Sequence, residues 1–205
     1  NGIKLFIPDA HVSDYLLVTA RTQKADNPED GISVFVVDAK SSGINYEVLK
    51  TIASDKQCEV VLNNVRVPRS SILGQVDKGW PIVDQALRRG AVGKCAEMVG
   101  NSQQVLEMAV EYAKNRVQFG RPIGSFQAIQ HHCANMATDV DGSRFITYQA
   151  AWRLSEGLEC DREVSMAKAW VSEACRRVAA LGHQVHGGIG FTKEHDMQLF
   201  FRRAK

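Results

Sequence analysis

The sequence predicts an α+β fold, in which a small antiparallel β-barrel or sandwich precedes an antiparallel, four-helix-bundle-like domain. Over residues 1–75, short runs rich in β-branched residues alternate with turn-forming residues, and no helical pattern separates them. The character of the chain changes at Gly79-Trp80-Pro81. Beyond that point, apolar and small residues recur at spacings of three and four, which is the pattern of a helix seam. We therefore expect two domains, residues 1–75 and 76–205.

The β region contains six runs that we expect to form strands. They are bounded by clusters of Asn, Asp, Gly, Pro and Ser, the residues that turns favour. Because no helix lies between the runs, a parallel sheet built from βαβ units is not expected. The expected strands are Lys4–Ile7, Tyr15–Thr19, Ser33–Val37, Tyr46–Leu49, Glu59–Leu62 and Val65–Val67.

Four helical stretches are expected after the β region. Pro81 suits the first turn of a helix, where its missing N–H costs nothing, and Gly120 and Pro122 end the first stretch. The third stretch holds a strict alternation of three and four from Val164 to Val185, so it should pack nearly antiparallel on its neighbours. The expected helices run from Trp80 to about Arg116, from about Ser125 to Glu156, from near Cys160 to the glycines at 187–190, and onward from near Glu194.

Composition is that of an ordinary globular protein, with 44% hydrophobic and 23% charged residues among 205. The formal net charge of +2 offers no bulk attraction to nucleic acid or to a membrane surface. Five widely spaced cysteines with no CxxC pair suggest reduced thiols, and hence a bacterial cytoplasm or a mitochondrial matrix. No apolar run approaches the length of a spanning helix, and we expect no signal peptide. The chain begins without Met and ends within a helical pattern, so we expect a fragment that lacks both ends.

The corner between the first two helices contains one candidate anion site. Arg116 offers a planar fork of donors suited to a diphosphate, and Gly120 permits a sharp turn. The start of the next helix adds free N–H groups and the positive end of a helix dipole. Phe119 is placed to form a wall beside an adenine or a ribose. The alternative is a structural helix corner with a solvated arginine.

Two further segments attract attention. Gln184–Phe191 has three glycines within four residues, which exposes backbone N–H groups as a possible anion nest. It follows a helix rather than a strand, so it is not the dinucleotide fingerprint of parallel α/β proteins, and a flexible helix cap is the alternative. The opening run Lys4–Ala10 is, by its residues alone, a strand that enters a turn.

Taken together, these segments resemble the acyl-CoA dehydrogenase family over essentially the whole chain. NGIKLFIPDAHVSDYLLVTART, GISVFVVDAKSSGI and VLNNVRVPRSSILG are similar to the end of that family's middle β domain. RVQFGRPIGSFQAIQHHCANM and QVHGGIGFTKEHDMQLFFRRAK are similar to its C-terminal helical domain. The order and spacing of the five blocks make the resemblance specific.

The resemblance implies FAD as cofactor, a flavoprotein of fatty acid and lipid metabolism, and a site completed across a dimer interface, usually within a homotetramer. Phe6, Ile7 and Pro8 match the segment beside the isoalloxazine ring, where the family often has Thr or Ser in place of Pro8. Positions that grip the FAD of a neighbouring subunit match Arg116, Gln118, Phe119, Ile123, Phe126, Gln127 and Ile129. The glycine segment that meets the same diphosphate matches Gln184, Val185, His186, Gly187 and Gly188.

The implied reaction is α,β-dehydrogenation of an acyl-CoA thioester, with an electron-accepting flavoprotein as partner. The resemblance places the usual catalytic base beyond Lys205. Some members carry the base on the first long helix, at the position of Gly90, which cannot serve. Glu97 lies two helical turns further on, although a solvated or interfacial role is the simpler interpretation. The sequence therefore assigns no catalytic and no substrate-binding residue.

Several alternatives stay open at this level. Acyl-CoA oxidases and flavin monooxygenase-like or nitroalkane-oxidising relatives share the scaffold, and some dehydrogenases pair a competent chain with a non-catalytic one. A DNA-associated flavoprotein is disfavoured by the modest charge. His183 and His186, with His195 nearby, could suggest a metal, but helix packing and cofactor contact explain them better. His131 and His132 point to different faces of a helix.

Overall fold

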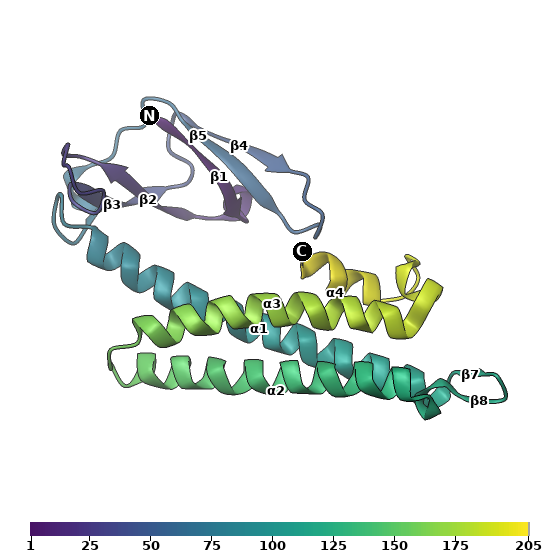
Figure 1. The fold of residues 1–205 in the computed structure, drawn as a ribbon. Coiled ribbons are helices and arrows are strands. Elements are labelled where there is room, and N and C mark those ends of the chain that lie inside the picture. Colours follow the sequence, from purple (N-terminus) through teal and green to yellow (C-terminus); the bar gives the residue numbers. More distant parts are fainter. Residues whose placement is uncertain (205) are drawn as a thin grey trace. The chain divides into compact units, whose positions relative to one another are not determined.

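The computed structural model describes residues 1–204 and divides into two units, Asn1–Leu87 and Arg88 to the end of the chain (Figure 1). The first unit is built of strands and the second of helices, which confirms the α+β class. The division falls within the first long helix, between Leu87 and Arg88. In the described part of the chain, no helix combines the length and the apolar character needed to cross a membrane.

Two three-stranded antiparallel sheets form the first unit, in the orders β1-β5-β4 and β2-β3-β6. The two sheets share one core, to which Leu16 of β2 and Cys58 and Val60 of β5 contribute buried side chains. In β5, the alternate residues Cys58, Val60 and Leu62 face this core because side chains alternate across a pleated strand. The strands are β1 (Gly2–Pro8), β2 (Tyr15–Arg21), β3 (Ile32–Asp38), β4 (Ile44–Leu49), β5 (Gln57–Leu62) and β6 (Ile72–Leu73).

The sequence placed five of these strands correctly and one wrongly. Val65–Val67 does not form a strand, and Ile72–Leu73 pairs with β3 instead. The β-branched residues at 65 and 67 match the composition of a strand, but strand propensity describes fit to a sheet and supplies no partner. Pro68 follows directly and has no N–H to donate to a ladder.

Four α-helices were expected in the second part of the chain, and residues 80–204 form four. In Figure 1, α2 and α3 run side by side, α1 passes behind α3 at an angle, and the short α4 lies along the later half of α3. Gly157, with a φ of 66°, lies in the turn between α2 and α3. The helices are α1 (Trp80–Asn115), α2 (Gln127–Ser155), α3 (Asp161–His186) and α4 (Met197–Arg203).

The predicted seam of α3 is buried almost throughout. Val171 and Val178 are fully buried, and Val185 is 4% exposed. An ion pair on the surface adds to the packing of α2 on α3, because Arg177 donates to both carboxylate oxygens of Asp139, at 3.0 and 2.8 Å.

Among the glycines of the helical unit, Gly182 of α3 has the closest neighbours. A Cβ added there would lie 2.5 Å from Cγ1 of Val105 on α1 and 3.2 Å from Sδ of Met197 on α4. Only a residue without a side chain leaves room for both neighbours. Gly182 therefore sets the distance between α1, α3 and α4.

We predict that Gly182→Ala destabilises the protein. Overpacking a close contact costs roughly 1–3 kcal/mol, which exceeds the gain of at most ~1 kcal/mol from replacing a helical glycine. Thermal unfolding should show a midpoint lower by several degrees, at about 2–4 °C per kcal/mol for a chain of this size. Gly93→Ala on α1 is the matched control, because no atom lies within 4 Å of its added Cβ. A Gly182→Ala midpoint equal to or above that of wild type would contradict the packing argument.

Candidate functional site

The corner between α1 and α2 is a β-hairpin, which the sequence analysis expected only as a sharp turn. Val117–Gln118 (β7) pairs with Arg121–Pro122 (β8) around a two-residue loop. Both loop residues have positive φ, 55° at Phe119 and 77° at Gly120, as the tightest hairpins require. The Phe-Gly dipeptide was the only sequence signal for this loop, and Phe is an unusual residue at its first position.

Hydrogen bonds fix the base of the hairpin. The amide of Arg116 donates to the carbonyl of Tyr112 at 2.8 Å, and the amide of Ile123 donates to the carbonyl of Arg116 at 2.8 Å. Gly124 lies so close to α1 that an added Cβ would stand 2.9 Å from the carbonyl oxygen of Ala113. The hairpin therefore projects from a rigid support.

The predicted cofactor residues of this corner divide into two groups. Ile123 and Ile129 are half-buried and pack against the helical core, so their side chains have a structural role whatever else they contact. Phe119 is 90% exposed, the highest value among the large hydrophobic residues. The exposed group consists of Arg116, Gln118, Phe119 and Gln127, with Phe126 half-buried between the two groups.

The glycine segment follows the last residue of α3. Gly187 has a φ of 61°, and a short 3₁₀ helix, Gly187–Phe191, continues from it. Gly187 and Gly188 are exposed, and nothing lies within 4 Å of a Cβ added at either position. Their backbone is thus open to an approaching ligand. Val185 differs, because its side chain is 4% exposed and belongs to the core.

A stacked pair of rings connects the glycine segment to the hairpin. His186 is 4% exposed, and its ring stacks on Tyr112 of α1 at 4.6 Å between centroids. Nδ1 of His186 lies 2.8 Å from the carbonyl oxygen of Gly182, so this nitrogen carries the proton. Burial lowers the pKa of His186, which keeps the ring neutral near pH 7. Tyr112 lies one turn before Arg116, so the stack brings the two predicted segments to the same end of the helical unit.

Tyr112 and Arg121 were not singled out in the sequence. Tyr112 precedes Arg116 by four residues and therefore shares a helix face with it, which is a signal that could have been used. The role of Arg121 depends on the hairpin, which the sequence did not predict. Its guanidinium lies over the ring of Phe126, with the central carbon 4.1 Å from the ring centroid.

The histidines near this end of the helices are held by packing. His183 contacts the rings of Phe191 and Phe201 at 4.5 and 4.4 Å, and burial lowers its pKa. His195 accepts a hydrogen bond from the amide of Met197 at Nδ1, at 3.1 Å. Among residues 1–204, no three His, Cys, Asp or Glu side chains are grouped so as to hold a metal ion.

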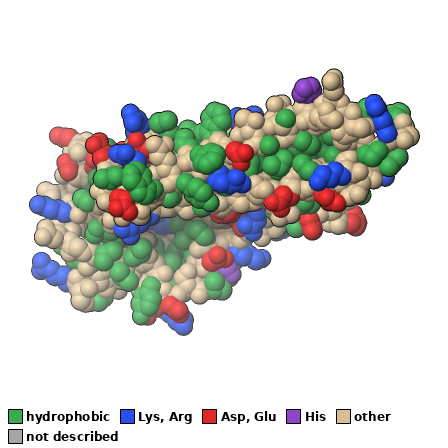
Figure 2. Space-filling model, turned by 90° about the horizontal axis from the view of Figure 1, so that it is seen from below, with side chains coloured by type: hydrophobic (Ala, Val, Ile, Leu, Met, Phe, Trp, Pro, Cys, Tyr) green, Lys and Arg blue, Asp and Glu red, His purple; other side chains and the backbone are tan. Residues whose placement is uncertain are grey.

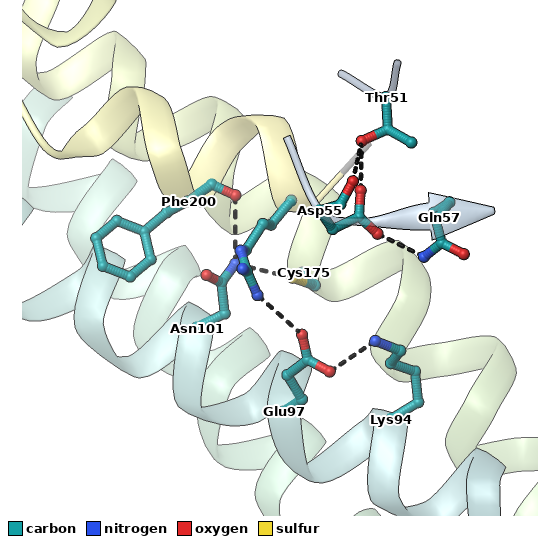
Figure 3. A network of polar contacts seen from close by, with 9 residues as sticks. Thr51, Asp55, Gln57, Lys94, Glu97, Asn101, Cys175 and Phe200 are labelled. Carbon is teal, nitrogen blue, oxygen red and sulfur yellow. Dashed lines mark hydrogen bonds and ion pairs between the residues drawn. The ribbon is translucent and has the colours of Figure 1, made fainter. Parts of the chain in front are cut away.

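A groove runs beside α1, and Glu97 lies at its far end from the hairpin. One part of the groove, of about 510 Å³, is lined by Tyr112, His186 and His195 among others. The adjoining part reaches Glu97, whose carboxylate lies 2.6 Å from Nζ of Lys94 and 3.6 Å from Nη1 of Arg203. Figure 3 shows the pairing of Glu97 with Lys94, and the Asn101 amide pointing to the Phe200 carbonyl. A base that takes up a proton would have to give up these two cationic contacts.

The first unit contributes the segment Phe6–Pro8, which lies at an irregularity of β1. The register with β5 shifts between Lys4 and Ile7, and Phe6 has a φ of 58°. Phe6 is 66% exposed, whereas Ile7 packs against the core of the β unit. Bulges of this kind bend a strand and redirect a side chain, and they are frequent beside functional sites. The sequence did not predict the bulge.

Comparison with known proteins places this geometry in a family. Residues 77–205 match the profile described as acyl-CoA dehydrogenase, C-terminal domain. The chain is 36% identical to 3-(aryl)acrylate reductase of Clostridium sporogenes, covering 100% of this chain and 55% of that protein. It is 34% identical to the CarC subunit of the caffeyl-CoA reductase-Etf complex of Acetobacterium woodii, with the same coverage of 100% and 55%. It is 35% identical to the mitochondrial short/branched chain specific acyl-CoA dehydrogenase of Bos taurus, covering 100% and 48%.

Solved structures show the same similarity in three dimensions. Butyryl-CoA dehydrogenase from Megasphaera elsdenii superposes with a TM-score of 0.95 at 31% identity, covering 100% of this chain and 54% of that chain. The glutaryl-CoA complex of glutaryl-coenzyme A dehydrogenase gives a TM-score of 0.95 at 34% identity, covering 100% and 52%. PigA with FAD and proline gives 0.93 at 27% identity, covering 98% and 53%. This chain thus spans about half the length of the relatives that it matches, and it belongs to the acyl-CoA dehydrogenase family.

Proposed function

We propose that this chain is the flavin-binding part of an FAD-dependent acyl-CoA dehydrogenase that desaturates the α,β bond of an acyl-CoA thioester. The observation that carries the proposal is that the Arg116 hairpin and the Gly187-Gly188 turn lie at the same end of the helical unit, where Tyr112 stacks on His186. The two segments offer a guanidinium and open backbone N–H groups, which suit a diphosphate. Membership of the family supports FAD as the ligand.

The residues present fit a flavin dinucleotide. We assign the diphosphate to Arg116 and to the backbone of Gly187 and Gly188, and we assign a wall of the adenosine pocket to Phe119. The open space above both glycines and the exposure of Arg116 and Phe119 support these roles. From the first unit, Phe6–Pro8 would lie beside the isoalloxazine ring, although Pro8 can donate no hydrogen bond there. When bound, FAD supplies the two-electron acceptor for the dehydrogenation.

His186 has a positioning role in this proposal. Its protonated Nδ1 is bonded to the Gly182 carbonyl, and its ring rests on Tyr112. Because burial keeps the ring neutral, it adds no charge beside the phosphate. Its function is to hold the Gly187 turn at a set distance from Arg116.

We propose that the base that removes the α proton is not among residues 1–205. The family places a base either beyond Lys205 or at the position of Gly90, which has no side chain. Glu97 is paired with Lys94 and Arg203, and Glu194 lies exposed in the turn before α4. The ion pairs of Glu97 support a structural role for that carboxylate.

Self-association is part of the same proposal, and two surfaces support it. The hairpin carries the exposed Phe119 next to the proposed FAD site. A separate surface on the outer faces of α2 and α3, the aromatic patch, has four aromatic residues and one methionine that are 47–68% exposed: Phe145, Tyr148, Trp152, Trp170 and Met166. Aromatic side chains bury roughly 150–250 Å² each, so the patch has an area of several hundred Å², the size at which exposed patches mark interfaces. Figure 2 shows that hydrophobic side chains are exposed at several places on the face of the molecule seen there, among charges of both signs. We propose a dimer through the hairpin and a tetramer through the aromatic patch.

The two reductases among the relatives favour a second candidate activity. Reduction of a C=C bond next to a carbonyl is the reverse of α,β-dehydrogenation, so the same site would serve either direction. The relative that belongs to an Etf complex supports an electron-transferring flavoprotein as partner. Bacterial relatives and a mitochondrial one support a bacterial cytoplasm or a mitochondrial matrix as the location. Assays with a saturated and an unsaturated acyl-CoA, each with a matching electron acceptor or donor, separate the two directions.

We predict that the complete gene product containing this chain purifies with bound FAD, and that Arg116→Ala weakens FAD retention. Loss of a charged hydrogen bond costs roughly 1.5–3 kcal/mol, so the dissociation constant should rise about 10- to 100-fold. Flavin absorbance after gel filtration and titration of the apoprotein measure this. Lys114→Ala is the matched control. It removes one positive charge near the end of α1 and leaves the Arg116 guanidinium in place, so it should change FAD affinity little. Arg116→Ala protein that holds FAD as tightly as wild type would show that the assignment of Arg116 is wrong.

We predict that one variant loses both self-association and FAD, and that another loses only the tetramer and keeps FAD. Phe119→Ala at the hairpin should shift sedimentation toward monomer and release FAD, because the site is completed by a second subunit. Tyr148→Glu in the aromatic patch should convert tetramers to dimers and leave FAD in place. A protein that is monomeric at micromolar concentration and still binds FAD stoichiometrically would contradict the shared site.

We predict that the 205-residue chain supplied with FAD does not oxidise acyl-CoA, whereas the complete gene product does. A positioned base typically contributes ~10²–10⁴-fold to such a reaction. An assay with butyryl-CoA and an artificial electron acceptor measures this, with the Megasphaera elsdenii enzyme as positive control. Turnover by the chain that disappears in Glu97→Gln or Glu194→Gln would place the base within this chain and refute the proposal.

A further inference from the structure

We propose that Arg121 is a positioning residue that holds the exposed ring of Phe119 for docking on a second copy of the chain. This inference rests on the self-association proposed above and assigns a role to a residue outside the predicted cofactor set. Arg121 would act through its neighbours Phe126 and Phe119, without touching FAD.

The first step of the argument is the backbone of Phe119. A non-glycine residue in the left-handed region is strained, and a bulky aromatic one is uncommon there. The loop accepts this strain and leaves the ring 90% exposed to solvent. Within the described chain, neither the backbone geometry nor burial of the ring favours a phenylalanine at this position. Contact of the ring with a second copy of the chain would favour a phenylalanine there.

The second step is the arrangement of three side chains. The ring of Phe119 meets the ring of Phe126 nearly perpendicularly, at 87° and 6.1 Å between centroids. The guanidinium of Arg121 covers the same Phe126 ring at 4.1 Å. Arg121 is paired with Gln118 across the hairpin, directly beside the loop. Phe126 is thus held by Arg121 and in turn limits where the Phe119 ring can point.

The third step is the choice of cation. A guanidinium is a flat, weakly hydrated group that stacks on an aromatic face, whereas an ammonium is a compact and strongly hydrated point charge. A stacking role therefore distinguishes Arg from Lys. A role as a simple phosphate-binding charge would be retained in large part by Lys and would weaken as salt is added.

A double-mutant cycle on the complete gene product tests the inference. Self-association is measured by sedimentation, with FAD added in excess to every sample, for wild type, Arg121→Ala, Arg121→Lys, Phe119→Ala and the Arg121→Ala/Phe119→Ala pair. We expect Arg121→Ala to weaken association on the order of 2- to 10-fold, with Arg121→Lys rescuing little of the loss. In the Phe119→Ala background, Arg121→Ala should change association by less than twofold. Circular dichroism checks that each variant is folded.

The outcomes distinguish a wrong role for Arg121 from a wrong proposed function. An equal loss from Arg121→Ala with and without Phe119 would overturn the positioning role. Full rescue by Lys together with strong salt dependence would assign Arg121 to phosphate binding and would also overturn it. A wild-type protein that neither associates nor binds FAD would refute the proposed function itself, and the role of Arg121 with it.

Discussion

The approach of α1 and α3 at Gly182 is the contact on which the rest of the helical unit depends. Because Gly182 has no side chain, Val105 of α1 reaches the backbone of α3, and Met197 of α4 packs on the same point. One turn later, the buried ring of His186 stacks on Tyr112, and its Nδ1 donates a hydrogen bond to the carbonyl of Gly182. The end of α3 therefore lies beside the end of α1. That arrangement brings the glycine turn to the same end of the helical unit as the Arg116 corner.

The base of the hairpin is rigid, and its tip is exposed to solvent. Backbone bonds at Arg116 and Ile123 and the tight contact of Gly124 with α1 leave its base little freedom. Its tip carries an aromatic ring in a strained and solvent-exposed position. Strain of this kind persists only where the surrounding structure enforces it, and it is often found at binding sites. In the proposed dimer, this geometry would lower the entropy lost when the hairpin binds a second subunit.

The two units supply different parts of the proposed chemistry. In the proposed function, the helical unit would supply the diphosphate and adenosine contacts, and the β unit carries the bulge that exposes Phe6. Neither unit presents a free carboxylate at a position where the family places a base. Glu97 is held between Lys94 and Arg203, which suits a residue that connects α1 to α4.

The sequence by itself determined the α+β class, five of the strands and the extents of the long helices, because these depend on periodicity and on local turn chemistry. The buried face of α3 from Val164 to Val185 could be predicted from residue spacing, since residues three and four apart share a face of any helix. Residue blocks around Arg116 and Gly187 also indicated the family. Tertiary structure alone decided that Val65–Val67 has no pairing partner and that β1 carries a bulge at Phe6. It also decided that Tyr112 stacks on His186 and that Arg121 covers Phe126. The physical reason is that hydrogen-bond partners and ring contacts depend on which distant segments meet, and the periodicity of a single segment carries no information about its neighbour.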